Sequence, residues 1–305
     1  MDFSVVVTQM VILFAIVIAG YICGKVNLMN QALSKGLSNL IVNLTCPALI
    51  IASTMGDNMP DRSLILPLLA IGTITYAILL VIASYLPKLF GIKAEERGLY
   101  SFMLTFGNVG FIGYPIVASI FGNEAVFYAS VLNVLNTITV FLWGTQFVAG
   151  KSDKGFDWSK LYCPGLIGTY ISILIVAFAL QTPKPVAQIF TYIGNITVPG
   201  SLLIIGYSIS QIPARHMAGG PKILLMSAFR LIILPLFVML CLKATGLFDP
   251  IAININTIII AMPVASFGTI FCLKFGVDET VMAQGTFVTT LLSLLTIPLV
   301  VTLIL

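Results

Sequence analysis

The sequence predicts an all-α polytopic membrane protein of ten transmembrane helices, built as two five-helix halves that cross the bilayer in opposite senses. Three observations carry this prediction: an apolar composition, ten apolar segments with alternating loop charge, and short motifs that recur half a chain apart. Only 9% of the 305 residues are charged and 59% are hydrophobic, with a mean hydropathy of +1.08. A soluble domain carries about 25% charged residues, so we expect lipid to cover most of this chain.

Each expected helix is an apolar run of about the 20 residues that cross the hydrocarbon core of a bilayer. The runs cover residues 4–23, 34–55, 64–86, 98–121, 124–149, 161–181, 187–210, 221–242, 252–273 and 279–304. The first run has no basic region before it and no small-residue cleavage pattern after it. We therefore expect a retained helix rather than a signal peptide.

The loops between these runs alternate in basic charge, which predicts the orientation. Eleven basic residues fall in one set of loops: Lys25, Lys35, Lys88, Lys93, Arg97, Lys151, Lys154, Lys160, Arg215, Lys222 and Lys274. The other set holds three: Arg62, Lys184 and Lys243. Loops rich in lysine and arginine stay in the cytoplasm, so we expect a multi-pass protein of the cell membrane with both termini outside. The acidic residues all fall in loops or at helix ends, which leaves no carboxylate at mid-membrane.

Two motifs recur at nearly one spacing and divide the chain into repeats 1–150 and 151–305. Segment 43–47 (NLTCP) returns as 195–199 (NITVP) 152 residues later, and the Phe-Gly pair at 121–122 returns at 275–276 after 154 residues. The repeat-matched residues are Asn43, Pro47, Asn195 and Pro199. Because five helices per half is an odd number, the second half enters from the opposite face. Inverted repeats of this kind are typical of secondary transporters.

The fourth and ninth apolar runs each contain a helix-breaking stretch. Residues 107–115 read GNVGFIGYP and residues 261–268 read AMPVASFG, and such stretches do not keep a regular helix. Unwound backbone at membrane depth must face protein or a water-filled cavity, and paired interruptions indicate a binding site at mid-bilayer. A simple proline kink is the alternative for each. The expected crossover residues are Gly107, Asn108, Gly110, Gly113, Pro115, Pro263, Val264 and Ser266.

Half-helix N-termini that point into one cavity favour an anion, so a carboxylate-bearing substrate is the hypothesis that follows. Polar residues expected around the cavity are Ser130, Asn133, Thr137 and Gln284. Such residues also serve as hydrogen-bond partners between helices, and both roles stay open for each. Arg230 is the one charge deep in an apolar run. It either binds an anion or satisfies the carbonyls of a broken helix, and the sequence does not decide between these roles.

The stretch from Gly107 to Pro115, with the Phe-Gly turn at 121–122, resembles the auxin efflux carrier family of bacterial permeases. The second-half stretch from 261 to 298 resembles it too, so the likeness covers nearly the whole chain. More distantly the chain is similar to the plant PIN-formed auxin exporters and the bile acid:sodium symporters. The resemblance implies a scaffold of helices 1, 2, 6 and 7, a transport domain of helices 3–5 and 8–10, elevator-type alternating access and a homodimer.

The family's crossover asparagine maps to Asn108 and its two crossover prolines map to Pro115 and Pro263. The plant proteins carry a polar residue after the second proline, where this chain has Val264. That departure disfavours a plant-like auxin site. The long cytoplasmic loop of the plant proteins is replaced by residues 151–160.

These observations favour a secondary transporter of small organic anions, carboxylates such as dicarboxylates or auxin-like acids, with the anion and membrane lipid as partners. A sodium-coupled organic anion symporter of the bile-acid type is the alternative. Sodium sites use carbonyls and often a carboxylate, and no acidic residue lies near either break. An enzyme would need an aspartate pair or a histidine-based site within the spans, and the only histidine, His216, is in a loop. We expect no cofactor, no metal and no nucleic-acid partner.

Overall fold

The computed structural model describes residues 3–55, 60–150, 161–211 and 220–304. The expected loop at 151–160, and Arg215 and His216, lie outside these ranges. The described residues form helices, and none of them forms a β-strand. Six helices are long and apolar enough to cross a membrane: Gln31–Ala52, Arg62–Leu89, Ala125–Ala149, Lys184–Ser210, Pro221–Thr245 and Thr280–Ile304. Four shorter apolar helices are Val11–Lys25, Val109–Phe121, Pro164–Ala177 and Pro250–Ile260.

The first half of the chain contains the elements α1 (Phe3–Lys25), α2 (Gln31–Leu40), η1 (Ile41–Thr45), α3 (Cys46–Ala52), η2 (Arg62–Leu64), α4 (Ile65–Leu89), α5 (Arg97–Thr105), η3 (Val109–Gly113), α6 (Tyr114–Phe121), α7 (Ala125–Thr139), η4 (Val140–Gly144) and α8 (Thr145–Ala149). The second half contains α9 (Pro164–Ala177), α10 (Lys184–Gly194), α11 (Thr197–Ser210), α12 (Pro221–Ala228), η7 (Phe229–Ile233), α13 (Leu234–Thr245), α14 (Pro250–Ile260), α15 (Phe267–Phe275) and α16 (Thr280–Ile304).

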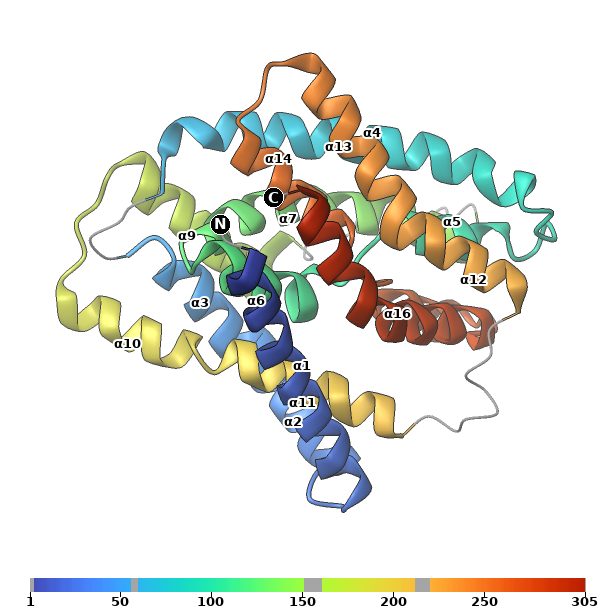
Figure 1. Cartoon of the computed structure of the whole chain (residues 1–305), viewed down its shortest axis with the longest axis horizontal. Coiled ribbons are helices and arrows are strands. Elements are labelled where there is room, and N and C mark those ends of the chain that lie inside the picture. Colours follow the sequence, from blue (N-terminus) through green and yellow to red (C-terminus); the bar gives the residue numbers. More distant parts are fainter. Residues whose placement is uncertain (1–2, 56–59, 151–160, 212–219, 305) are drawn as a thin grey trace.

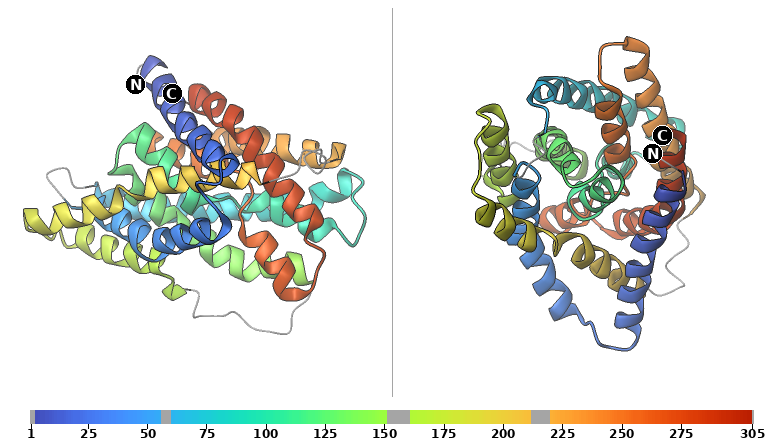
Figure 2. Two further views of the ribbon diagram at one scale, coloured as in Figure 1. Left: turned by 90° about the horizontal axis from the view of Figure 1, so that it is seen from below. Right: turned by 60° about the vertical axis from the view of Figure 1, so that its left-hand side comes forward.

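The helices fall into two groups in space. In Figure 1, α3, α9 and α10 lie on the left and α1, α2 and α11 at the bottom centre, whereas α4 runs across the top and α5, α12, α13 and α16 lie on the right. Within the second group α4 packs on α5 and α7, α13 packs on α14, and α15 packs on α8 and α16. The start of α1 and the end of α16 lie side by side in every view (Figures 1 and 2).

Glycines permit the close packing of α1 on α11. A Cβ atom on Gly206 would lie 1.9 Å from the backbone oxygen of Val17, and one on Gly20 would lie 2.3 Å from that of Leu203. No side chain fits at either position. Small residues let membrane helices approach at backbone distance and gain van der Waals contact, since lipid tails supply no hydrophobic driving force between helices.

The repeated NLTCP and NITVP segments meet each other in the fold. Thr197 Oγ1 donates a hydrogen bond to Thr45 Oγ1 at 2.9 Å, and both side chains are fully buried. Asn43 and Asn195, in contrast, are exposed, and the Asn43 amide donates to the Asn39 carbonyl of its own helix. Pro47 is half-buried and Pro199 is exposed. The contact between the two halves is therefore made by the central threonines.

One expected helix differs from the structure. The run 187–210 lies within one span, Lys184–Ser210, but its regular helix is interrupted between α10, which ends at Gly194, and α11, which begins at Thr197. Pro199 has no N–H to donate to the carbonyl of Asn195, so the helix restarts with the proline in its first turn, where N–H groups need no intrahelical partner.

Candidate functional site

The two interrupted helices meet backbone to backbone. After α5 and α14 end, the non-helical residues that follow pair as an isolated antiparallel bridge between Gly107 and Val264. Two hydrogen bonds close this pairing: Asn108 N–H donates to the Pro263 carbonyl at 2.8 Å, and Ala265 N–H donates to the Phe106 carbonyl at 3.0 Å. The unwound segments thus supply polar partners for each other, which the bilayer interior does not offer.

Side chains from the flanking helices complete the bridge. The hydroxyl of Thr289 on α16 accepts a hydrogen bond from Val264 N–H at 3.1 Å, and it donates to the carbonyl of Gly285 at 2.7 Å. On the other strand of the bridge, Asn108 Oδ1 accepts from Phe111 N–H at 3.3 Å and so caps the helix that restarts there. Val264, one of the two residues of the bridge, is fully buried.

Arg230 joins the ends of both interrupted helices. Its Nη1 donates to the carbonyls of Leu104 and Thr105 at 3.1 Å each, and its Nε donates to the carbonyl of Met262 at 3.2 Å. The side chain is 1% exposed. A Cβ atom on Gly107 would lie 2.3 Å from Nη2, so glycine makes room for the guanidinium. Carbonyls at the end of a helix have no intrahelical donor and carry partial negative charge. The cation satisfies them, which is the second of the two roles that the sequence leaves open.

A cavity of about 1180 Å³ extends from the bridge. Its polar lining residues near the bridge and along α7 and α8 are Asn108, Ser266, Asn133, Asn136, Thr137, Thr145 and Gln146. The first turn of α9 closes another side through Cys163 and Gly165. The cavity therefore lies between the two groups of helices, with α9 and η1 from one group and α7, η4 and α15 from the other.

The polar wall on α7 is ordered by a chain of hydrogen bonds. Tyr76 on α4 donates from its hydroxyl to Asn136 Oδ1 at 2.8 Å, and Asn136 Nδ2 donates to Asn133 Oδ1 at 3.0 Å. The Tyr76 ring also stacks on Phe106, just before the bridge, with a centroid separation of 6.4 Å. This arrangement fixes two carboxamides at the cavity wall.

An adjoining wall is one face of α15, on which aromatic residues predominate. Phe267, Phe271 and Phe275 line the cavity at four-residue spacing, and the Phe141 ring lies 5.8 Å from each of the first two rings. Ser266, at the N-terminus of α15, makes no side-chain capping hydrogen bond. In the first turn of this helix, Gly268 N–H donates to the Ala265 carbonyl at 3.1 Å, and Ser266 and Phe267 stand at the cavity wall.

Expected site residues divide into those that line this cavity and those that support it. The lining residues are Gly107, Asn108, Gly110, Asn133, Thr137 and Ser266. The remaining expected residues, which do not belong to its described lining, are Gly113, Pro115, Ser130, Arg230, Pro263, Val264 and Gln284. Ser130 illustrates the second group, because its hydroxyl is fully buried and donates to the Phe127 carbonyl at 2.8 Å. The matched residues Asn43, Pro47, Asn195 and Pro199 also lie away from the cavity lining.

Sequence reasoning missed four contributors: Tyr76, Asn136, Gln146 and Lys274. Asn136 could have been found, because it follows Asn133 by three residues and so shares its helix face. Tyr76 gave no signal, since an aromatic residue in an apolar run has many ordinary roles. Lys274 was counted only as a loop charge, although it lines the cavity.

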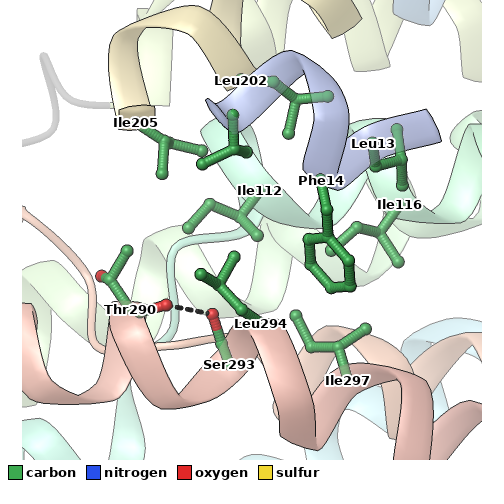
Figure 3. A pocket seen from close by; sticks show the side chains of 11 residues that line it. Leu13, Phe14, Ile112, Ile116, Leu202, Ile205, Thr290, Ser293, Leu294 and Ile297 are labelled. Carbon is green, nitrogen blue, oxygen red and sulfur yellow. Dashed lines mark hydrogen bonds between the residues drawn. The ribbon is translucent and has the colours of Figure 1, made fainter. Parts of the chain in front are cut away.

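A tightly packed apolar seam lies on the other side of η3. Figure 3 shows Leu13 and Phe14 of α1 facing Leu294 and Ile297 of α16, with Ile112 of η3 beside them. The space among these side chains is about 30 Å³. One water molecule needs at least about 10–15 Å³ of such volume together with polar partners, so the seam has room for little else. The restarted helix thus has a large cavity on one side and a closed apolar contact on the other.

Known proteins resemble the chain along nearly its full length. The family described as membrane transport protein matches residues 5–301. An uncharacterized transporter of Methanocaldococcus jannaschii is 28% identical over 306 residues, which cover 94% of this chain and 95% of the relative. An uncharacterized transporter of Methanothermobacter thermautotrophicus is 22% identical, with 93% of both chains covered. A Rhizobium meliloti protein named "Putative malonate transporter" is 20% identical, with 93% of this chain and 91% of the relative covered.

Proposed function

This chain belongs to the membrane transport protein family, and from that premise we propose that it is a secondary transporter of small organic anions. The observation that carries the proposal is the cavity of about 1180 Å³ that reaches the paired helix breaks. Asn108 and Ser266 bring an amide and a hydroxyl to that end of the cavity, where α15 begins without a side-chain cap. Helix N-termini favour anions. The name of the Rhizobium relative supports a carboxylate substrate.

The architecture we propose is ten membrane crossings in a 5+5 inverted repeat. The fourth crossing (α5, η3 and α6) and the ninth crossing (α14 and α15) form the crossover pair. Six long and four shorter apolar helices are consistent with ten crossings. Elements α1–α3 and α9–α11 would form the scaffold, and α4–α8 and α12–α16 the transport domain. The contact of Thr45 with Thr197 supports a two-fold relation, because equivalent residues of two repeats meet where the axis between them passes.

Transport would proceed by elevator-type alternating access, with the substrate held at the crossover. The cavity reaches Gln146, Cys163 and Lys274, which adjoin the loops expected in the cytoplasm. The apolar seam closes the other side of η3 (Figure 3). This arrangement corresponds to an inward-facing state, with both termini outside the cell membrane. Sliding of the transport domain along the scaffold would open the seam and close the cavity.

The sodium-coupled alternative is disfavoured by the position of Arg230. A sodium ion at the crossover would need oxygen ligands such as backbone carbonyls. The carbonyls of Leu104, Thr105 and Met262 already accept hydrogen bonds from the guanidinium. A fixed cation therefore occupies the place where the helix ends offer negative partial charge. We propose uniport, or cotransport of a protonated acid, rather than sodium symport.

Uptake into proteoliposomes tests this function. Purified protein in vesicles should accumulate radiolabelled malonate or another short carboxylate when an excess of unlabelled acid is trapped inside, with equal rates in sodium and in choline buffer. Empty vesicles are the control. Uptake that requires sodium would favour the symporter, and absence of exchange for every mono- and dicarboxylate tried would contradict an organic anion transporter. The homodimer that the family resemblance implies would be tested by light scattering of the purified protein.

A further inference from the structure

Lys274 is the one charged residue in the described lining of the cavity. It lies in the last turn of α15, on the same face as Ser266 and Ile270, at four-residue spacing along the wall. The side chain is exposed. A lysine in this loop follows the positive-inside rule, but that rule does not require it to share a helix face with the crossover.

Among the residues that the structure describes, the surroundings of Lys274 leave its ammonium available to a ligand. Its Nζ lies over the ring of Phe275, 5.7 Å from the centroid, where the ring face attracts a cation weakly. The acidic residue that follows, Asp278, is engaged by Thr280, whose N–H and hydroxyl donate to Oδ1 at 2.9 Å and 2.6 Å. These hydrogen bonds lower the pKa of the Asp278 carboxyl below its usual value. The negative charge nearest in sequence thus has local partners of its own.

The spacing along α15 suits a ligand with a charge at each end. Eight residues at the rise of an α-helix separate Ser266 from Lys274 by ~12 Å between Cα atoms. Helical side chains tilt toward the N-terminus, and lysine has a flexible four-carbon stem, so a rotamer change from the Phe275 ring would bring the ammonium back toward the crossover. The stretch between them presents Ile270 and Phe271, which suit methylene groups.

We propose that Lys274 is a specificity-determining residue that binds the second carboxylate of a short dicarboxylate whose first carboxylate is held at the crossover by Asn108 and Ser266. This inference rests on the proposed function and deepens it. A monocarboxylate of equal length gains the crossover donors but offers nothing to Lys274. The cavity therefore prefers the diacid, and the preference resides in one side chain.

Equilibrium binding of matched acids tests the proposal. The probes are saturated dicarboxylates of three to five carbons and the monocarboxylates of the same carbon number, measured on the full chain in nanodiscs of zwitterionic lipid. These discs carry no net anionic headgroups that would compete for the lysine. K274Q should weaken dicarboxylate binding about tenfold, the equivalent of about 1.4 kcal/mol, and change monocarboxylate binding less than twofold. K274R should retain the preference.

The matched control is K243Q, which removes a lysine from the last turn of α13, outside the cavity lining. Equal weakening of both acid classes by K274Q would overturn the proposal, because it would indicate general attraction of anions. Unchanged binding of both classes would overturn it too. If the unaltered protein binds no carboxylate at all, the proposed function fails together with this inference, whereas the first two outcomes leave that function intact.

Discussion

A buried guanidinium in a membrane protein needs several acceptors, and Arg230 finds them in carbonyls that two broken helices leave without donors. The guanidinium and the carbonyls satisfy each other's hydrogen-bonding groups, since the interior of a bilayer offers no water to either. Gly107 is part of the same arrangement, because its hydrogen side chain admits Nη2. Position 107 therefore requires glycine for space as well as for the helix break.

Replacing Arg230 with methionine tests this structural role. R230M keeps an apolar stem but leaves three carbonyls unsatisfied, and hydrogen bonds to charged groups contribute about 1.5–3 kcal/mol each. We expect a lower folded yield and a clearly lower melting temperature of the purified protein. R97M is the control, because Arg97 makes one hydrogen bond to the Ile92 carbonyl near the helix end. Normal stability of R230M with abolished carboxylate binding would instead assign Arg230 to the substrate.

Replacing Asn108 should lower carboxylate affinity more than it lowers stability. N108A removes the amide at the cavity and the cap on Phe111 N–H, which costs about 1 kcal/mol of stability. We expect carboxylate affinity to fall about tenfold or more, a loss comparable to that of a hydrogen bond to a charged group. N43A, at the exposed matched asparagine, should leave binding unchanged. Carboxylate binding and melting temperature, measured on the same samples, separate the effect on affinity from the effect on stability. Unaltered affinity of N108A would show that Asn108 is not part of the substrate site.

At the scale of elements, the sequence predicts what is local. Glycine and proline mark the breaks in the fourth and ninth runs, because they act on the backbone at their own positions. The interruption before α11 was not predicted, because Pro199 was noted only as a residue matched to Pro47 in the repeat. The hydrogen bonds from Tyr76 to Asn136 and from Val264 to Thr289 join segments far apart in the chain. No local sequence pattern encodes such pairs, so the residues that support the site were identified only from the folded structure.

The packing of α1 on α11 yields a prediction at this scale. In G206A the new methyl group would meet the Val17 carbonyl, so the two helices must separate and the melting temperature should fall. Gly36 is a matched control on α2, where an added Cβ has nothing within 4 Å. G36A should be neutral or slightly stabilising, because alanine favours a helix by about 0.8–1.0 kcal/mol over glycine. Equal stability of both variants would contradict a tight contact between α1 and α11.

At the scale of the whole molecule, composition and loop charge predicted a multi-pass helical membrane protein, and the six long apolar helices confirm that class. The resemblance to the auxin efflux carrier permeases is confirmed at the level of the family. The ten-helix inverted repeat, the elevator motion and the substrate stay proposals. The elevator motion is a property of two groups of helices moving against each other, which no local sequence pattern encodes.

The central claim is that a carboxylate binds in the cavity that reaches the crossover from the cytoplasmic side. Cys163 lines that cavity and is partly exposed, so its labelling reports on both parts of the claim. In a variant whose other four cysteines are alanine, a membrane-impermeant maleimide should label inside-out vesicles faster than right-side-out ones. A saturating short dicarboxylate should slow this labelling severalfold. Labelling confined to right-side-out vesicles, or unaffected by every carboxylate that is transported, would contradict the account.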